Sequence, residues 1–244
     1  MGLTQLTMAW ADDFSTSDTT PVPSGNDPIF LPQHVSEIPD SPLKGKNLIF
    51  LGSSITLGEK ALSNSMADYI GKKHAASCIK EAEGGTTMAD HGGKSYVHRL
   101  LTKINKDLDL DGLIVQLSTN DASQCVPLGE IAKSDDINTF DTKTITGAIE
   151  YIIAYSKMTW NCPVVFFTSP RFESPAYDAM VNRLYEIQKK WNIGIIDLWN
   201  DPDFNILSES QRKQYMSDTI HPTMAGYLLW WTPRFEAELM TLIQ

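Results

Sequence analysis

The sequence lacks any uninterrupted apolar run of about 18 residues, the length at which a segment becomes a candidate transmembrane helix. It also lacks an excess of positive charge, because 20 Lys and Arg face 30 Asp and Glu, for a net charge of −10 at pH 7. Nucleic-acid phosphates and anionic lipid surfaces both attract basic proteins. We therefore expect a small-molecule partner rather than a nucleic acid or a membrane.

Cysteine is scarce, and the three present do not form a recognisable pattern. The odd count and wide spacing of Cys78, Cys125 and Cys162 argue against a disulfide framework and a zinc site. We interpret them as free thiols, with Cys78 and Cys162 buried, which favours a reducing compartment and a cytoplasmic location. The sequence contains no GxGxxG motif, P-loop or metal-ligand spacing, so we expect neither a cofactor nor a metal.

Periodic apolar residues are also sparse before residue 46. Residues 11–46 carry six prolines and many Ser, Thr and Asp, a composition that cannot bury enough surface to fold alone. We predict an extended or flexible arm over residues 1–45 and a single folded domain over 46–244. The apolar residues 29–31 would let the arm dock either on its own domain or on a neighbouring subunit of a homo-oligomer.

Beyond residue 46, short apolar runs alternate with longer amphipathic segments. The runs predict buried strands at 47–51, 77–82, 112–117, 163–168 and 193–197. The amphipathic segments predict helices at about 63–75, 94–106, 143–159, 174–191 and 223–242. This alternation indicates a three-layer α/β/α sandwich around a five-stranded parallel sheet, with a flavodoxin-like strand order. In such sheets, ligands bind beyond the carboxyl ends of the strands.

Small polar residues follow the first three predicted strands. Ser54 comes after a glycine turn, where its hydroxyl would be exposed and its N–H would lie near a helix start. Gly84 and Gly85 could bring a backbone N–H close to a ligand, or could simply form a turn. Asn120 could donate its amide to the same ligand, or it could cap a helix, as could Asp121.

Near the C-terminus, Asp218 precedes His221 by three residues, just before the last predicted helix. The carboxylate could hold one imidazole nitrogen while the other accepts a proton from Ser54. The alternative is a histidine that only supports its loop. His221 differs from the other histidines in having an acidic residue at this spacing next to a helix start.

These four segments together resemble a known family. FLGSSIT (50–56), EGGTT (83–87), STND (118–121) and SDTIHPTMAGY (217–227) resemble, in order, the marker blocks of the SGNH (GDSL-type) hydrolases. The resemblance spans about residues 46–243. It implies a catalytic domain that cleaves a small carboxylic ester through an acyl-enzyme, with a carbohydrate acetyl ester or a short-chain acyl ester as substrate. Ser54 would be the nucleophile, His221 the general base and Asp218 its orienting partner.

The resemblance also implies an oxyanion hole formed by the Ser54 N–H, the Gly85 N–H and the Asn120 side chain. The sequence departs from the family pattern at two positions, where Ser53 replaces the usual Asp and Ser118 the usual Gly. Thioesterase or lysophospholipase activity on the same residues, or a non-catalytic carbohydrate-binding role, are the alternatives.

Two further residues are candidate substrate contacts. Arg171 directly follows the fourth predicted strand, and Asp121 follows the third, so both lie on the side of the sheet where ligands bind. Arg99 would be either a substrate contact or a structural residue. We expect Trp230 and Trp231 to pack in the core, and we expect residues 122–142 to form a lid or rim over the pocket.

Overall fold

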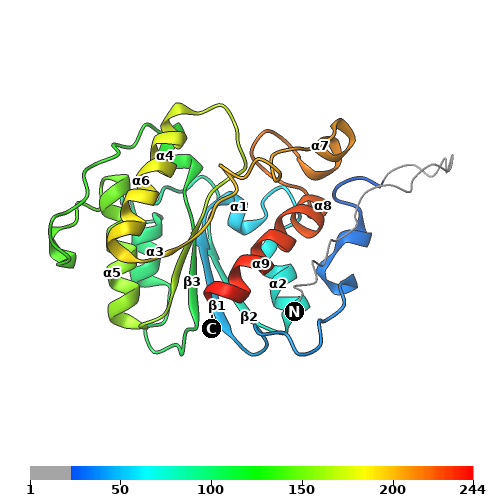
Figure 1. Cartoon of the computed structure of the whole chain (residues 1–244), viewed down its shortest axis with the longest axis horizontal. Coiled ribbons are helices and arrows are strands. Elements are labelled where there is room, and N and C mark those ends of the chain that lie inside the picture. Colours follow the sequence, from blue (N-terminus) through cyan, green and yellow to red (C-terminus); the bar gives the residue numbers. More distant parts are fainter. Residues whose placement is uncertain (1–22, 244) are drawn as a thin grey trace, which may run out of the picture.

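The computed structural model describes residues 23–243, and its centre is one sheet of five parallel strands (Figure 1). The strand order is β2-β1-β3-β4-β5. The strands are β1 (Asn47–Gly52), β2 (Ser77–Ala82), β3 (Gly112–Gln116), β4 (Val164–Phe167) and β5 (Gly194–Ile196). The predicted α/β/α sandwich and its flavodoxin-like order are confirmed.

Helices cover both faces of this sheet (Figure 1). One face carries α3 (Tyr96–Thr102), α5 (Ile145–Thr159) and α6 (Pro175–Trp191). The other carries α1 (Ser54–Leu57), α2 (Met66–His74), α8 (Met224–Gly226) and α9 (Thr232–Leu242). Shorter elements are α4 (Thr119–Ser123), α7 (Glu209–Tyr215), the 3₁₀ helices η1 (Pro28–Phe30), η2 (Pro32–His34) and η3 (Ile137–Thr139), and the π-helix η4 (Tyr227–Trp231). None of the helices in residues 23–243 is long and apolar enough to cross a membrane.

The central strands are apolar on both faces because each face meets a helical layer. Along β1, Ile49 and Leu51 pack into the core on the α5 side, whereas Leu48 and Phe50 pack into the core on the α9 side. All four side chains are at most 1% exposed. This two-sided burial explains why the strands appear in the sequence as continuous apolar runs rather than as an alternating pattern.

The predicted helix at 223–242 is divided into three parts, α8, η4 and α9. Pro233 lies in the first turn of α9. Proline has no N–H to donate to the carbonyl four residues earlier, and its ring crowds that carbonyl. A wider π-turn before the proline relieves both problems, and it carries Trp230 and Trp231.

Residues 23–45 lie on the domain of their own chain (Figure 1). Phe30 is 8% exposed and belongs to the core on the α9 side, and its carbonyl accepts a hydrogen bond from the Tyr69 hydroxyl at 2.8 Å. Asn26 Oδ1 accepts the N–H of Met224 at 2.9 Å. The segment therefore connects α2 to the start of α8. Residues 1–22, the rest of the predicted arm, lie outside the described residues, and the homo-oligomer stays a prediction.

Candidate active site

A tight turn at the end of β1 presents the Ser54 side chain. Gly52 is required there, because a Cβ on this residue would lie 1.8 Å from Oγ1 of Thr56. The side chain of Gln116, on neighbouring β3, holds the turn. Its Oε1 accepts the N–H groups of Ser53 and Thr56 at 3.0 and 3.2 Å, and its Nε2 donates to Ser53 Oγ at 3.0 Å. Ser53 is thus fully buried in this network, and Ser54 is the serine that lines the pocket.

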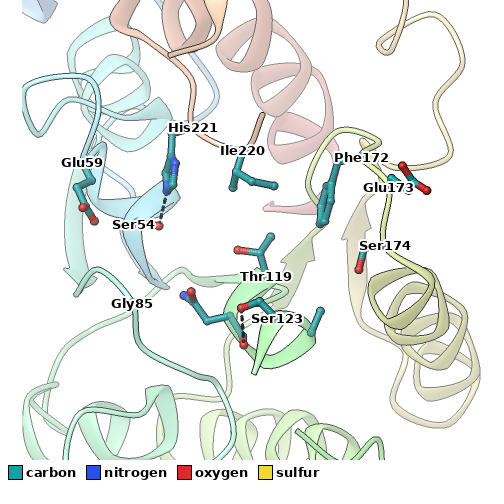
Figure 2. A pocket seen from close by; sticks show the side chains of 12 residues that line it. Ser54, Glu59, Gly85, Thr119, Ser123, Phe172, Glu173, Ser174, Ile220 and His221 are labelled. Carbon is teal, nitrogen blue, oxygen red and sulfur yellow. Dashed lines mark hydrogen bonds between the residues drawn. The ribbon is translucent and has the colours of Figure 1, made fainter. Parts of the chain in front are cut away.

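Ser54 meets His221 although 167 residues separate them in the sequence. Their Oγ and Nε2 atoms are 2.8 Å apart (Figure 2). On the other side of the ring, Nδ1 lies 2.8 Å from Oδ2 and 3.1 Å from Oδ1 of Asp218. The imidazole is therefore held between a hydroxyl and a carboxylate, an arrangement in which the hydroxyl proton can pass to the ring.

The Asp218 carboxylate is fixed by its own loop. Its Oδ1 accepts the backbone N–H groups of Ile220 and His221, both at 2.8 Å. Partial burial raises the pKa of this carboxyl, but these two N–H groups and the His221 ring outweigh that effect. The pKa of Asp218 consequently lies below its usual range, and the carboxylate stays charged beside His221.

Three potential donors to an oxyanion line the same pocket: the residues Ser54, Gly85 and Asn120. Gly85 has a φ of +73°, a conformation that favours glycine. Among the bonds formed within residues 23–243, none uses the backbone N–H of Ser54 or Gly85. Asn120 Nδ2 donates one hydrogen bond to the Thr86 carbonyl at 3.0 Å, and an amide has a second hydrogen to offer.

The pocket has a volume of about 540 Å³, and most of the residues that line it are polar. Its lining residues are Ser54, Glu59, Gly85, Thr119, Asn120, Ala122, Ser123, Phe172, Glu173, Ser174, Ile220 and His221. Phe172 and Ile220 are the large apolar side chains among them. In Figure 2, Glu59 and Glu173 lie at opposite ends of the pocket. A carboxylate at each end disfavours an anionic group in this space.

The two predicted substrate contacts lie elsewhere. Asp121 is fully buried and does not line the pocket, because its carboxylate accepts the N–H groups of Met88 and Ala89 at 2.6 and 3.0 Å. The prediction that Asp121 contacts substrate is therefore wrong, since it supports a neighbouring loop. Arg171 is exposed and lines a second, adjoining cavity instead of the pocket at Ser54.

Arg99 is a structural residue, which is one of the two roles that the sequence allowed. It is 2% exposed, and its guanidinium donates to the carbonyls of Gly52 and Glu81 at 2.7 and 2.8 Å. It also bonds to Thr86 Oγ1 at 3.2 Å. Arg99 thus joins the carboxyl ends of β1 and β2, from which the loops carrying Ser54 and Gly85 extend.

Most of the predicted lid does not cover the pocket. Within residues 122–142, Ala122 and Ser123 line it. Several apolar side chains further along instead belong to or pack against the core on the α5 side, namely Val126, Leu128, Ile131, Ala132, Ile137 and Phe140. These apolar residues lack a regular period, which is why the sequence suggested a polar loop.

Sequence reasoning missed two supports of the site. Gln116 was visible as a polar residue within an apolar strand, but its role depends on a contact across 63 residues. The N-terminal segment holds the start of α8, directly after His221, through Asn26 and through the Gly25 carbonyl, which accepts the N–H of Ala225 at 2.8 Å. No local pattern indicates that contact.

Comparison with known proteins agrees with this geometry. The model of the GDSL-like lipase/acylhydrolase family matches residues 50–229. No curated protein matches the chain.

Several solved structures share the fold. A protein from Bacteroides ovatus described as a GDSL-like lipase aligns over 81% of this chain and 99% of its own, with a TM-score of 0.60 and 15% identity. A family two carbohydrate esterase from Clostridium thermocellum, solved with cellohexaose, aligns over 80% and 64%, with a TM-score of 0.58 and 17% identity. An acetyl xylan esterase, AlAXEase, aligns over 78% and 98%, with a TM-score of 0.53 and 17% identity.

Proposed function

Because this chain belongs to the GDSL-like lipase/acylhydrolase family, it is an ester-hydrolysing enzyme, and we propose that it cleaves small carboxylic esters through an acyl-enzyme on Ser54. The observation that carries the proposal is the continuous contact from Ser54 Oγ to His221 Nε2 and from Nδ1 to Asp218, each at 2.8 Å. A serine hydroxyl needs a base within this range to become a nucleophile.

The reaction has two halves. Ser54 Oγ attacks the ester carbonyl while its proton moves to His221 Nε2, and the carbonyl oxygen becomes an oxyanion near the N–H groups of Ser54 and Gly85 and the amide of Asn120. The C–O bond to the alcohol then breaks, and His221 returns the proton to the departing oxygen. Water repeats the sequence on the acyl-enzyme, releasing the acid and restoring the Ser54 hydroxyl. Asp218 holds the His221 ring in one tautomer and stabilises the imidazolium that forms transiently.

We assign the acyl side to short chains, acetyl above all. The pocket at Ser54 is lined mostly by polar residues, with Phe172 and Ile220 as its large apolar side chains. A long fatty acyl chain would find few large apolar side chains in this pocket against which to bury its methylene groups, and each buried CH₂ is worth about 0.8 kcal/mol. Two structural neighbours are named as a carbohydrate esterase and an acetyl xylan esterase, which supports a carbohydrate acetyl ester as substrate.

The decisive experiment compares Ser54→Ala with Ser53→Ala. We expect Ser54→Ala to abolish hydrolysis of p-nitrophenyl acetate and labelling by a fluorophosphonate probe, with an unchanged circular dichroism spectrum. Ser53→Ala, the matched control, should still be labelled, because Ser53 supports the turn without entering the pocket. Retained turnover in Ser54→Ala would refute the mechanism.

The choice of substrate separates the alternatives. A thioesterase would prefer an acyl-thioester to the corresponding oxygen ester, and a lysophospholipase would prefer octanoyl to acetyl esters. A non-catalytic carbohydrate-binding relative would not react with the probe at all. We expect the acetyl ester to give the highest kcat/KM of this series.

A further inference from the structure

A second cavity adjoins the pocket at Ser54. Its volume is about 270 Å³, and it is lined by Ser169, Pro170, Arg171, Phe172, Asn205, Leu207, Arg212, Met216, Thr219, Ile220 and Trp230. Phe172 and Ile220 line both spaces, so these two side chains form a shared wall. Because Ile220 directly precedes His221, the second cavity lies on the histidine side of the site.

The charged residues lining this cavity are both arginines, Arg171 and Arg212. Arg212 lies on α7 and makes no ion pair or side-chain hydrogen bond with any residue in the described part of the chain. Arg171 is held in place by an ion pair from Nη2 to Asp178 at 3.2 Å and by the Trp199 ring, 5.1 Å from its guanidinium carbon. A guanidinium has five N–H donors, so Arg171 keeps several for a ligand.

Other features suit a bound polar ring. Trp230 lies in the π-helix η4, and its indole N–H already donates to the Phe204 carbonyl at 2.9 Å, so the indole offers a ligand mainly apolar surface. Phe172 adds a second aromatic wall.

The position of the cavity identifies which part of a substrate would reach it. His221 Nε2 must come within hydrogen-bond distance of the departing oxygen, so the alcohol portion of the ester extends on the side of His221 and Ile220. We propose that the second cavity binds an oxyanion, a carboxylate or a phosphate, carried by that alcohol portion. Arg171 and Arg212 would contact the anion, and Trp230 would contact the adjoining ring. This assignment rests on the proposed function.

The two spaces on either side of the wall formed by Phe172 and Ile220 carry opposite charges, so the proposed site would select among esters by the position of their charge. Glu59 and Glu173 line the pocket at Ser54, whereas the arginines line the second cavity. An ester with a neutral acyl group and an anionic alcohol matches the charges of both, with the acyl group in the pocket at Ser54 and the alcohol in the second cavity. An ester with the charges reversed would place its anion between two carboxylates. The enzyme should therefore prefer acetyl esters of acidic or phosphorylated sugars to those of neutral sugars.

The test measures acetate release from three acetylated sugars: a methyl glucoside, a methyl glucuronide and glucose 6-phosphate. For the wild-type protein, we expect kcat/KM for at least one anionic ester to exceed that for the neutral ester by about tenfold or more, the value of one hydrogen bond to a charged group. The anionic ester with the higher kcat/KM shows whether the second cavity prefers a carboxylate or a phosphate. Added salt should reduce the ratio.

Arg212→Gln should lower the ratio of anionic to neutral kcat/KM by about tenfold, mainly through KM. Lys213→Gln is the matched control, because it removes the same charge from the same helix but does not line the second cavity. A ratio near one in the wild-type protein, or one that Arg212→Gln leaves unchanged, would overturn the proposal.

Failure of the proposed function gives a different result. If the wild-type protein hydrolyses none of the esters, the mechanism on Ser54 fails. Binding of methyl glucuronide and glucose 6-phosphate to the Ser54→Ala protein, measured by calorimetry against methyl glucoside, then decides the assignment of the cavity without any turnover. Preferential binding of an anion, weakened by Arg212→Gln and not by Lys213→Gln, would support it, and equal binding would overturn it.

Discussion

Asp218 shows how the surroundings of a single residue set its charge. Although its side chain is 43% exposed, two backbone N–H groups and an imidazole converge on its carboxylate. A carboxyl whose pKa is lowered on folding stabilises the fold above the pKa it has in the unfolded chain, and this contribution is lost as the pH falls through the lower folded value. Protonation of Asp218 is therefore displaced toward more acidic pH.

This displacement predicts the acid side of the pH–rate profile. Because the pKa of Asp218 lies below its usual range, its protonation adds no second step to the profile in the range where the proposed general base acts. The logarithm of kcat/KM for p-nitrophenyl acetate should thus rise with pH at a slope of one, before any change in circular dichroism. A slope of two, or loss of activity that coincides with unfolding, would contradict the assignment.

We predict that Asp218→Asn lowers kcat by about 10⁴-fold, because the His221 ring then adopts the wrong tautomer.

At the scale of elements, the site depends on how β1 and β3 are joined at their ends. Gln116 supports the turn that carries Ser54 with a neutral side chain, whose amide both accepts from and donates to the turn. Ser53 is small enough to accept the Gln116 N–H within the buried space. The serine at position 53, where the family usually has aspartate, and the glutamine at 116 therefore form one unit.

We predict that Gln116→Ala is more harmful than its distance from the substrate suggests. The N–H groups of Ser53 and Thr56 would lose their acceptor inside the core, at a cost of about 1–3 kcal/mol for each group. Urea unfolding should show this loss of stability, and kcat should fall while KM changes little, because the position of Ser54 shifts. Gln116→Glu keeps the acceptor and should retain more activity than Gln116→Ala. Equal kcat values in the wild-type protein and Gln116→Ala would exclude this role.

The elements differ in how far the sequence could predict them. The strands and the meeting of Ser54, Asp218 and His221 were predictable, because strand burial leaves continuous apolar runs and the marker segments are local. The breaks in the last helix and the true role of Asp121 were not, since each depends on one proline or on one loop 32 residues away. Trp231 lies in the core as expected, and Trp230 packs against that core while it also lines the second cavity.

Across the whole molecule, the longest-range support of the site comes from residues 23–45. Asn26 holds the first N–H of α8 across 198 residues, immediately after the loop of His221. Asn26 Nδ2 also donates to the Lys60 carbonyl at 2.8 Å, in the loop that follows Ser54. One side chain therefore joins the segments that carry the proposed nucleophile and base.

Replacing Asn26 should accordingly affect both stability and catalysis. We expect Asn26→Ala to lower the free energy of unfolding by about 1 kcal/mol and to lower kcat, because the helix start behind His221 loses a cap. Ser36→Ala, in an exposed part of the same segment, is the control and should match the wild-type protein. Thermal unfolding and p-nitrophenyl acetate kinetics measure the two effects. A destabilised Asn26→Ala protein with unchanged kcat would show that the contact supports the fold alone.

The contact between Ser54 and His221 also has a consequence for protein synthesis. A ribosome adds roughly 5–20 residues per second, so the 167 residues from Ile55 through His221 take about 8–33 s to make. Throughout that interval, the nascent chain carries a serine without its base. By the proposed mechanism, the growing polypeptide therefore cannot attack cellular esters, and hydrolytic activity should begin only after the segment bearing His221 has emerged and folded against β1.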